Sequence, residues 1–469
     1  MSATWLPEQD RPDASIVHLG IGAFFRAFGV PVIEDAIAAS GGDWGVIGVS
    51  LRSPGIRDAL TPQDCVYHAL ERGPNGNHAR AIGTLRDVLY LGDQRAEILR
   101  AMTAPTTNIV SLTITEKGYC HDPASGNLNP DHPAIRADLA NPTRPSTAPG
   151  LITEALVRRR AADLPPFTCL SCDNLPANGP LLRGVTLAYA RLRDPDLADW
   201  ISETVAFPAT MVDRITPATT PADIAEVTRL TGHADAAPVV HEPFFQWVIE
   251  NKFNSPRPDF AAAEVQMVAD FAPFEAAKLR CLNGTHSAIA YLGALAALPT
   301  VRQACENPTI AAFIRALWAE EILPSLETPP GMELPAYTDS LMARYLNPGI
   351  EHRTHQIAMD GSQKLPQRLL GTVRDNLAAG FPIDRLATGV AAWMLYLNGT
   401  DESGATHQVF DPMADRLTTA ARTADPVSAL LAVEAIFGDD LPRKDTFTTA
   451  VRRAYTALSD GVLNALEAT

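Results

Sequence analysis

Short apolar runs of strand length alternate with helical patterns along the first part of the chain. The first strand is expected at Ile16 to Leu19, and a helical pattern then continues to about Ser40. Trp44 to Leu51 is the next buried run. Further strands are expected at Ala81 to Leu85, Ile109 to Thr115 and Phe167 to Ser171, with helices at Ala96 to Met102 and Gly150 to Ala162. This alternation predicts a parallel sheet with helices on both faces.

Glycines stand directly after the first strand. Gly20 and Gly22 form a G-x-G at the start of the helical pattern, and Arg26, not glycine, stands six residues after Gly20. Glycine at such a turn lets the backbone approach a pyrophosphate held at the helix N-terminus. The segment favours a dinucleotide-binding unit, and a plain strand–turn–helix connection is the alternative on these residues alone.

The pattern changes near residue 270. Strand signals fade there, and long Ala- and Leu-rich helical patterns follow, as in Arg302 to Leu323 and Asp375 to Leu397. We therefore predict an α/β protein with an N-terminal Rossmann-type dinucleotide-binding domain over residues 1–270. A mainly α-helical domain over residues 271–469 is expected to follow and to carry the substrate and catalytic residues.

Composition narrows the classes of function. The 469 residues include 38 Lys and Arg and 54 Asp and Glu, for a formal net charge of −16. Such a chain is a poor candidate for nucleic-acid binding, which needs a basic face. Its longest apolar runs fall short of the ~20 residues that span a bilayer, and Met1 to Asp13 has no apolar core of a signal peptide. We expect a cytoplasmic protein with neither nucleic-acid nor membrane partners.

The six cysteines give little sign of a metal or redox site. Cys169 and Cys172 form a C-x-x-C, but they lie in an apolar run that resembles the end of a strand. A redox or zinc pair would be expected at a helix start or beside a second pair of ligands. We expect no metal in this protein.

One apolar helical segment carries three polar side chains. Lys278, Asn283 and His286 lie at i, i+5 and i+8 among leucine, isoleucine and alanine. At about 100° per residue, the step from Lys278 to Asn283 is about 140°, and His286 lies about 60° back, so all three can project to one side. Burial lowers the pKa of a lysine, which can then act as a base near neutral pH. A snorkelling lysine beside a hydrogen-bonded core histidine is the structural alternative.

Six segments, in sequence order, carry a resemblance to a known family. They are Val110 to Cys120, Ser171 to Gly179, Met211 to Pro217, Glu242 to Glu250, Lys278 to His286 and His352 to Arg368. Over nearly its whole length the chain is similar to the long-chain polyol-specific dehydrogenases and reductases, a family that includes mannitol 2-dehydrogenase and fructuronate reductase. The resemblance implies metal-independent hydride transfer between NAD(H) and a ketose-type carbonyl.

The resemblance also implies roles for individual residues. Lys278 is the expected general acid/base, and Asn174 and Asn283 would donate hydrogen bonds to the developing alkoxide. His286 would bind and orient the substrate. Further substrate contacts are expected from Asp213, Arg353, Gln356 and Lys364, and cofactor contacts from Gly20, Gly22, Phe24, Arg26, Arg52, Thr115 and Glu116. The expected partners are a small sugar acid or polyol, in a monomer or small homo-oligomer.

Two departures from the family pattern concern the cofactor. The glycine turn of the family usually continues Phe-His-Arg-Ala-His, whereas Phe25 and Phe28 stand at the histidine positions here. We expect this change to alter the polarity near the mouth of the site. The acid that would bind the adenosine ribose is also missing, because Arg52 and Arg57 come before the first carboxylate, Asp58. NAD is the expected cofactor, and NADP is the alternative.

The segment before the Asp-Gly-Ser at 360–362 separates two substrate branches of the family. Mannitol dehydrogenases usually have arginine four residues earlier, where this chain has Gln356. The surrounding run looks more like fructuronate reductase, so we expect interconversion of D-fructuronate and D-mannonate. Arg353, Lys364 or Arg368 would supply a cation for the carboxylate. The alternatives are a polyol dehydrogenase for D-mannitol and D-fructose, or a diverged paralogue that binds cofactor without efficient turnover.

Overall fold

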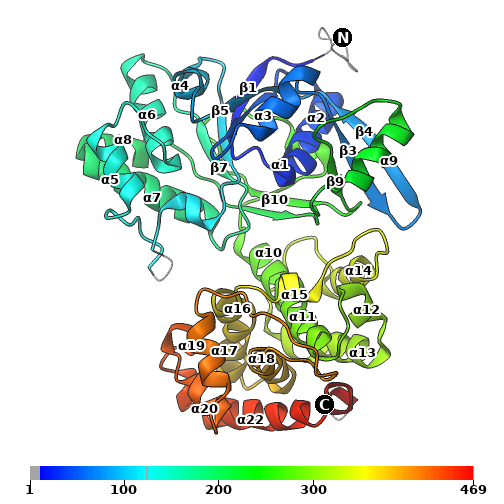
Figure 1. Cartoon of the computed structure of the whole chain (residues 1–469). Coiled ribbons are helices and arrows are strands. Elements are labelled where there is room, and N and C mark those ends of the chain that lie inside the picture. Colours follow the sequence, from blue (N-terminus) through cyan, green and yellow to red (C-terminus); the bar gives the residue numbers. More distant parts are fainter. Residues whose placement is uncertain (1–10, 123–124, 468–469) are drawn as a thin grey trace. The chain divides into compact units, whose positions relative to one another are not determined.

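The computed structural model describes residues 11–122 and 125–467. The chain divides into two compact units, Met1–Phe271 and Ala272–Thr469 (Figure 1). Each unit has hydrophobic cores of its own, one in the second unit and two large ones in the first. In the described part of the chain, no helix combines the length and apolar character that crossing a membrane requires.

Unit 1 is built on a five-stranded sheet in the order β5-β2-β1-β6-β7. The strands are β1 (Ala14–Leu19), β2 (Gly45–Ser50), β5 (Leu85–Tyr90), β6 (Ile109–Leu112) and β7 (Thr168–Ser171). All neighbours are parallel. The order reverses between β1 and β6, which is the point where dinucleotides bind in sheets of this kind. The predicted Rossmann-type domain with a parallel sheet is confirmed.

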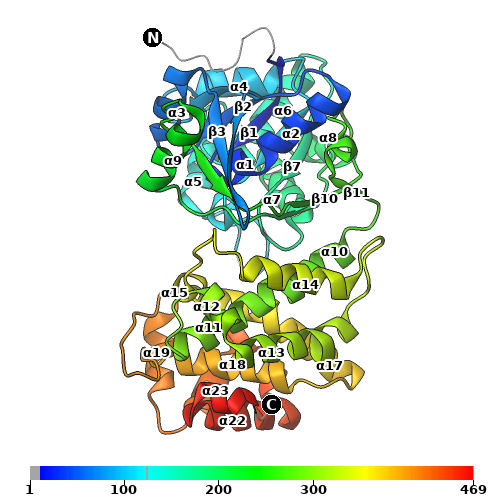
Figure 2. The same ribbon diagram turned by 90° about the vertical axis from the view of Figure 1, so that its right-hand side faces the viewer.

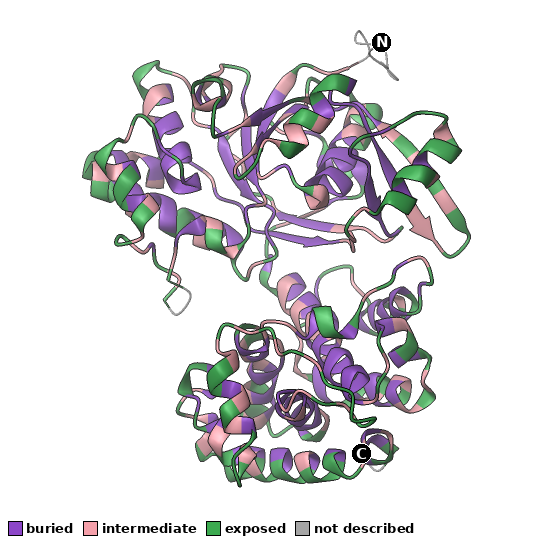
Figure 3. Ribbon diagram, in the orientation of Figure 1, coloured by how far each residue is buried: buried purple, intermediate pink, exposed green. Residues whose placement is uncertain are grey.

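Helices cover both faces of this sheet. They are α1 (Ala23–Ala27), α2 (Gly29–Ser40), α3 (Gly55–Leu60), α4 (Arg95–Thr103), α5 (Pro133–Ala140), α6 (Ala148–Ala161), α7 (Asn178–Arg193) and α8 (Pro195–Thr204). A further helix, α9 (Pro221–Thr231), packs instead on β3 (Tyr67–Gly73) and β4 (Gly76–Ile82). Neighbouring side chains of a strand point to opposite faces, so Val17 packs with α4, α6 and α7, and Ile16 packs with α1 and α2. Burial on both faces explains the continuous apolar runs, and the strands are buried along their length (Figure 3).

Two three-stranded sheets complete unit 1. One has the order β4-β3-β9, from β3 (Tyr67–Gly73), β4 (Gly76–Ile82) and β9 (Val239–His241). The other has the order β11-β10-β8, from β8 (Thr210–Asp213), β10 (Gln246–Glu250) and β11 (Gln266–Val268). The sequence analysis does not predict these strands. Most are short, and exposed residues alternate with part-buried ones along β4, so no apolar run marks them.

The strand expected at Ala81 to Leu85 is wrong. This segment contains the end of β4, a turn at Gly83 and Thr84, and the first residue of β5. The Glu34 carboxylate accepts hydrogen bonds from the backbone N–H groups of Gly83 and Thr84 at 2.8 and 3.0 Å. Apolar residues on both sides of this stabilised turn resemble a single strand in the sequence.

Unit 2 consists of helices, as predicted. They are α10 (Ala272–Ala277), α11 (Thr285–Leu295), α12 (Val301–Glu306), α13 (Pro308–Ala316), α14 (Leu334–Tyr345), α15 (Thr354–Ile357), α16 (Gly361–Leu365), α17 (Gly371–Ala379), α18 (Asp384–Tyr396), α19 (Ala414–Ala421), α20 (Pro426–Leu431), α21 (Glu434–Phe437), α22 (Asp445–Ser459) and α23 (Val462–Glu467). The π-helical turns are η5 (Lys278–Gly284), η6 (Leu317–Ile322) and η8 (Pro366–Leu370). The buried helix α18 packs against α11 and α22 (Figure 2).

Two long helices expected in unit 2 are each broken. The pattern from Arg302 to Leu323 is interrupted at Asn307, whose side chain caps α13 by accepting from the next backbone N–H groups. The pattern from Asp375 to Leu397 is interrupted at Gly380, which has φ 76° and ends α17. Both breaks occur at residues that favour helix ends, inside otherwise periodic apolar patterns.

Candidate active site

The glycine turn lies at the carboxyl end of β1. Gly20 has φ +92°, and a Cβ there would lie 2.1 Å from the carbonyl oxygen of Thr113. Only glycine fits this position. Gly22 is exposed at the start of α1, where the nearest atom to an added Cβ would be the Gly20 carbonyl oxygen, at 3.8 Å. The turn therefore brings bare backbone to the point where the strand order reverses.

His18 of β1 connects the glycine turn to the residues of and after β6. Its Nδ1 lies 2.8 Å from Ser111 Oγ, and its Nε2 lies 2.9 Å from Thr113 Oγ1. The Thr113 hydroxyl donates to the Gly20 carbonyl at 2.8 Å. Because that hydroxyl proton is already used, His18 Nε2 must donate to Thr113, and Nδ1 must accept from Ser111. Burial lowers the pKa of His18 well below its ordinary value, so the ring is neutral.

The two phenylalanines at the family's histidine positions lie in the core. Phe25 is 1% exposed and stacks on His18, with ring centroids 3.4 Å apart. Phe28 is fully buried against Phe245 and Trp247, with centroids 5.2 and 5.1 Å away. The expectation that these rings change the polarity near the mouth of the site is wrong, because both are enclosed by protein.

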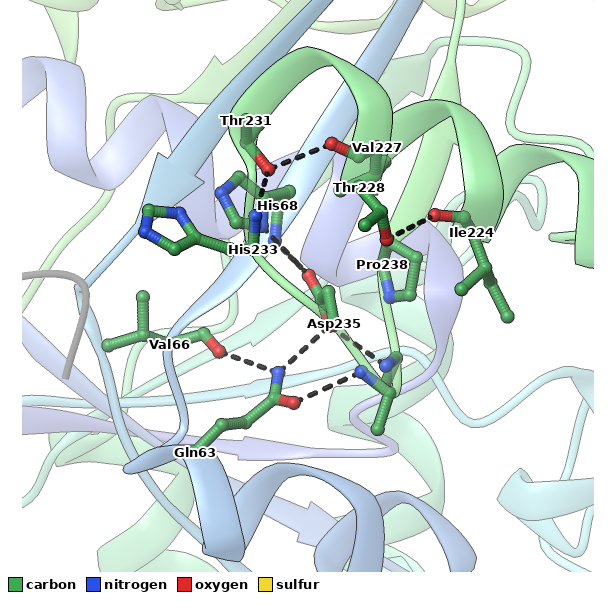
Figure 4. A network of polar contacts seen from close by, with 12 residues as sticks. Gln63, Val66, His68, Ile224, Val227, Thr228, Thr231, His233, Asp235 and Pro238 are labelled. Atoms are coloured by element: carbon green, nitrogen blue, oxygen red, sulfur yellow. Dashed lines mark hydrogen bonds and ion pairs between the residues drawn. The ribbon is translucent and has the colours of Figure 1, made fainter. Parts of the chain in front are cut away.

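Arg26 is also turned into the protein. Its side chain lies over the ring of Tyr67 at 5.5 Å and donates to the Ala237 carbonyl at 2.6 Å. Asp235 anchors the loop that contains Ala237. Its carboxylate accepts from Ala237 N at 2.9 Å and from Gln63 Nε2 at 2.8 Å (Figure 4). Since Arg26 is 3% exposed and committed to a carbonyl, we correct its expected role. It holds α1 on the protein instead of contacting a pyrophosphate.

Phe24 is part-buried beside Phe28, with ring centroids 5.1 Å apart. Arg52 is exposed two residues after β2. The nearby Arg57 is committed to carboxylates: its Nη1 lies 2.8 Å from Asp93, and its Nε lies 2.9 Å from Asp58. The end of β2 therefore presents the cation of Arg52 where an acid would bind ribose hydroxyls.

Thr115, Glu116 and Asn174 lie in the loops that follow the neighbouring strands β6 and β7. Thr115 and Asn174 are exposed, and Glu116 is part-buried. Asp173, which the sequence analysis did not single out, joins the two loops, because its carboxylate accepts from Thr115 N at 2.8 Å. The structure thus brings three predicted residues to the same edge of the sheet as the glycine turn. The sequence signal for Asp173 is an acid directly after a buried strand.

Asp213 is the last residue of β8 and is buried. The next residue, Arg214, donates to the carbonyls of Phe244 and Ala27 at 3.0 and 2.8 Å. The start of β8 is tied to the end of β7, where the Thr210 hydroxyl donates to the Ser171 carbonyl at 2.6 Å. The strand that carries Asp213 is therefore linked to the loop that carries Asn174.

Lys278 begins the π-helical turn η5, which continues into α11. Lys278 is 6% exposed, and Asn283 and His286 are part-buried. In a π-helix the backbone hydrogen bonds run from residue i to i+5. Lys278 and Asn283 are therefore about one turn apart instead of about 140° apart, as α-helical spacing predicts. All three residues lie on one continuous helical segment.

Side chains of unit 2 satisfy the carbonyl groups of the π turn. The Cys281 carbonyl accepts from Trp318 Nε1 at 2.9 Å, and the Leu282 carbonyl accepts from the Tyr345 hydroxyl at 3.2 Å. Carbonyls at such a transition lose their usual helical partners and need others. These bonds hold the turn and with it the relative positions of Lys278 and Asn283.

His286 lies beside a second histidine and near the cations Arg368, Arg344 and Lys364. Its ring centroid is 4.9 Å from that of His352. Burial lowers the pKa of His286 well below its ordinary value, and His352, Arg368, Arg344 and Lys364 lower it further. The imidazole is therefore neutral. Its Nε2 is buried and has no hydrogen-bond partner among the described residues, so it is available to a ligand hydroxyl.

The predicted substrate residues of the 352–368 segment differ in their surroundings. Arg353 and Gln356 are exposed. Lys364 of α16 is part-buried and donates to the carbonyls of Ile357 and Met359 at 3.1 and 2.5 Å. Burial, with the positive charge of Arg368, lowers the pKa of Lys364 to about 8. Lys364 is thus a cation near neutral pH whose charge is easily lost.

Unit 1 fits a dinucleotide, because the glycine turn exposes backbone at the switch point of a parallel sheet. The described residues offer no comparable site for a metal ion. Among residues 11–122 and 125–467, no group of three or more His, Cys, Asp or Glu could hold a metal ion. Cys169 lies in β7 and Cys172 just after it, and burial raises the pKa of both thiols. Buried thiols of this kind are poorly reactive.

Comparisons with known proteins cover the whole chain. The mannitol dehydrogenase Rossmann domain matches residues 14–262, and the mannitol dehydrogenase C-terminal domain matches residues 270–459. D-mannonate oxidoreductase of Escherichia coli is 44% identical over 460 residues, which cover 97% of this chain and 95% of that protein. Mannitol 2-dehydrogenase of Aspergillus terreus is 40% identical over 461 residues, which cover 96% and 92%.

A solved structure is also similar throughout. It is mannitol 2-dehydrogenase of Pseudomonas fluorescens, in a ternary complex with NAD and D-mannitol. The two structures agree with a TM-score of 0.89 at 38% identity, over 99% of this chain and 96% of that chain. Because the match covers 99% of this chain, it takes in both units.

Proposed function

This chain belongs to the mannitol dehydrogenase family, and on that premise we propose that it interconverts D-fructuronate and D-mannonate with NAD(H). The family makes it an oxidoreductase of polyols or sugar acids. The choice of NAD is supported by the glycine turn and by the NAD in the P. fluorescens complex. The choice of a sugar acid rests on one observation, the positive charge around His286.

A hexuronate carries a carboxylate that a hexitol lacks. Arg368 and Lys364 both act on the proposed substrate-binding imidazole of His286, and Arg368 also lowers the pKa of Lys364. These cations repel one another, so a carboxylate among them gains favourable interactions that a neutral polyol cannot provide. The identity to D-mannonate oxidoreductase supports the same substrate.

The proposed residues divide the chemistry between them. A bound nicotinamide supplies the hydride that reduces the keto carbon. Lys278 gives a proton to the keto oxygen as it becomes a hydroxyl. The side-chain amides of Asn174 and Asn283 donate hydrogen bonds to that oxygen while its negative charge develops. Neutral His286 binds a substrate hydroxyl through Nε2.

Oxidation of D-mannitol to D-fructose is the second candidate. The three cations that could bind a carboxylate are engaged elsewhere or exposed. Arg368 donates to Ser287 Oγ at 3.1 Å and to the Asn283 carbonyl at 3.5 Å. Lys364 donates to two backbone carbonyls, and Arg353 is exposed. A neutral substrate would leave these arrangements undisturbed. The third alternative, a paralogue without efficient turnover, was based on Phe25 and Phe28, and both rings lie in the core.

The test is a comparison of kcat/KM for D-fructuronate and D-fructose with NADH, repeated with NADPH. We expect fructuronate to be preferred by at least tenfold, since a buried cation without its carboxylate is costly. A ratio near one, or a preference for fructose, would move the chain to the polyol branch. Binding of NADH without turnover of either substrate would favour the paralogue. A preference for NADPH would assign Arg52 to the 2′-phosphate.

A further inference from the structure

Asp173 accepts three hydrogen bonds from the loop after β6. Its carboxylate receives the backbone N–H groups of Ile114 at 3.0 Å and Thr115 at 2.8 Å. The hydroxyl of Tyr119 donates to it at 2.8 Å and lies 2.6 Å from Ser171 Oγ. Asp173 is only 7% exposed. A buried carboxylate satisfied by three donors is held in one place.

The loop that Asp173 holds is strained. Thr115 has φ 63° and ψ 165°, a region that residues with a Cβ rarely adopt. Such conformations persist only where surrounding contacts enforce them, and they occur often at functional sites. The bond from Thr115 N to Asp173 is one of those contacts. It sets the direction of the exposed Thr115, beside the glycine turn.

The backbone of Asp173 is fixed as firmly as its side chain. Asn178 Nδ2 donates to the Asp173 carbonyl at 2.9 Å and to the Thr210 carbonyl at 2.9 Å. Thr210 N donates back to Asn178 Oδ1 at 3.0 Å. Asn174, the next residue, therefore leaves the sheet from a rigid point.

We propose that Asp173 is a positioning residue that sets the loop of Thr115 and the side chain of Asn174 relative to each other. The inference rests on the proposed function, in which Thr115 lies at the cofactor and Asn174 donates to the substrate oxygen. The carboxylate is a direct link between these two loops. Through it, the distance from the nicotinamide to the substrate oxygen is kept within the narrow range that hydride transfer requires.

The test is Asp173→Asn, which keeps the size of the side chain but replaces one acceptor oxygen with a donor. We expect kcat to fall about 10- to 100-fold, the range that a displacement of about 1 Å can cause. We also expect a several-fold rise in the Kd for NADH, measured by fluorescence. A role in folding alone would lower the melting temperature and leave kcat and this Kd unchanged.

The matched control is Asp138→Asn. Asp138 is also buried, and its carboxylate accepts four hydrogen bonds, from the backbone and hydroxyl groups of Ser146 and Thr147. We expect this variant to lose thermal stability with kcat within twofold of wild type. If Asp173→Asn keeps kcat and the Kd for NADH within twofold, or if Asp138→Asn lowers kcat as much, the proposal is overturned.

A second variant tests the proposal if Asp173→Asn does not fold. Tyr119→Phe removes one donor to Asp173 and leaves both backbone bonds, so it should fold and lower kcat by about threefold to tenfold. An unchanged kcat would count against the proposal. The assays use whichever sugar the wild-type enzyme turns over. Failure of fructuronate as a substrate is thus seen in the wild type, separately from any effect of Asp173.

Discussion

The imidazole of His18 and the phenyl ring of Phe25 stack face to face, with centroids 3.4 Å apart and planes within 5° of parallel. Phe25 covers the ring whose Nε2 holds Thr113 against the glycine turn. An apolar ring at the position where the family usually has histidine therefore encloses a neutral histidine and keeps water from its hydrogen bonds.

Because the neutral His18 is enclosed, we predict that the folded protein loses stability in acid. The pKa of His18 is lowered in the folded state by burial, so below pH ~6.5 the unfolded chain binds a proton that the folded chain does not. Stability is therefore complete above the unfolded pKa and falls as the pH is lowered from there. The slope is at most about 1.4 kcal/mol per pH unit for one such group. Urea unfolding followed at pH 5 and pH 7 measures it.

His18→Leu is the informative variant for that curve. It should lower the stability at pH 7, because the Ser111 and Thr113 hydroxyls lose their partner, by about 1–3 kcal/mol. It should also flatten the fall between pH 7 and pH 5. His241, whose pKa burial lowers to about 4, makes the same contribution to the pH dependence of stability in both proteins. A difference in slope between wild type and His18→Leu therefore comes from His18. An unchanged slope in His18→Leu would show that the pKa of His18 is not lowered in the folded protein.

Loss of the proposed acid/base should separate chemistry from cofactor binding. Lys278→Ala is expected to lower kcat by ~10²- to 10⁴-fold, the usual contribution of such a group. The Kd for NADH should stay within about twofold, because Lys278, like Asn283 and His286, is proposed to act on the substrate and not on the nucleotide. Lys252→Ala, at an exposed position, is the control and should keep wild-type kcat. Near-native turnover by Lys278→Ala at neutral pH would exclude this residue as the acid/base.

Lys364 should make the binding of a charged substrate depend on pH. Its pKa of about 8 means that it is protonated below that pH and loses its charge above it. The KM for fructuronate should therefore rise several-fold between pH 7 and pH 9, whereas the KM for fructose should change little. Lys364→Arg, which stays charged throughout, should abolish the rise. Equal pH profiles for both sugars would remove Lys364 from carboxylate binding.

The proposed mechanism needs no metal. Lys278 supplies the proton and the amides of Asn174 and Asn283 stabilise the alkoxide, which are the tasks that zinc performs in metal-dependent alcohol oxidation. We expect full activity after dialysis against a chelator. Activity that is lost with the chelator and restored by added zinc, but not by magnesium, would contradict the metal-free reaction.

Local sequence was enough for four of the five strands of the parallel sheet, and β5 was missed. Strands β1, β2, β6 and β7 are buried on both faces, so each is a continuous apolar run, and the glycines after β1 mark the turn. β4 is exposed along one face, and β8 to β11 are only three to five residues long, which is why these strands were not predicted. The helices around Asn307 and Gly380 were predicted too long, because the apolar period continues across both breaks.

In the candidate site too, some features follow from the sequence and others depend on the tertiary structure. The sequence by itself determined the family, the class of reaction and which polar residues stand on an apolar helix. Only the tertiary structure decided where the side chains point. Phe28 ends α1 with φ −118° and ψ −72°, and with that break Phe25, Arg26 and Phe28 enter the core. Likewise, the π turn at Lys278 and the bond from Thr115 to Asp173 depend on partners distant in sequence, and such contacts leave no periodic pattern along the chain.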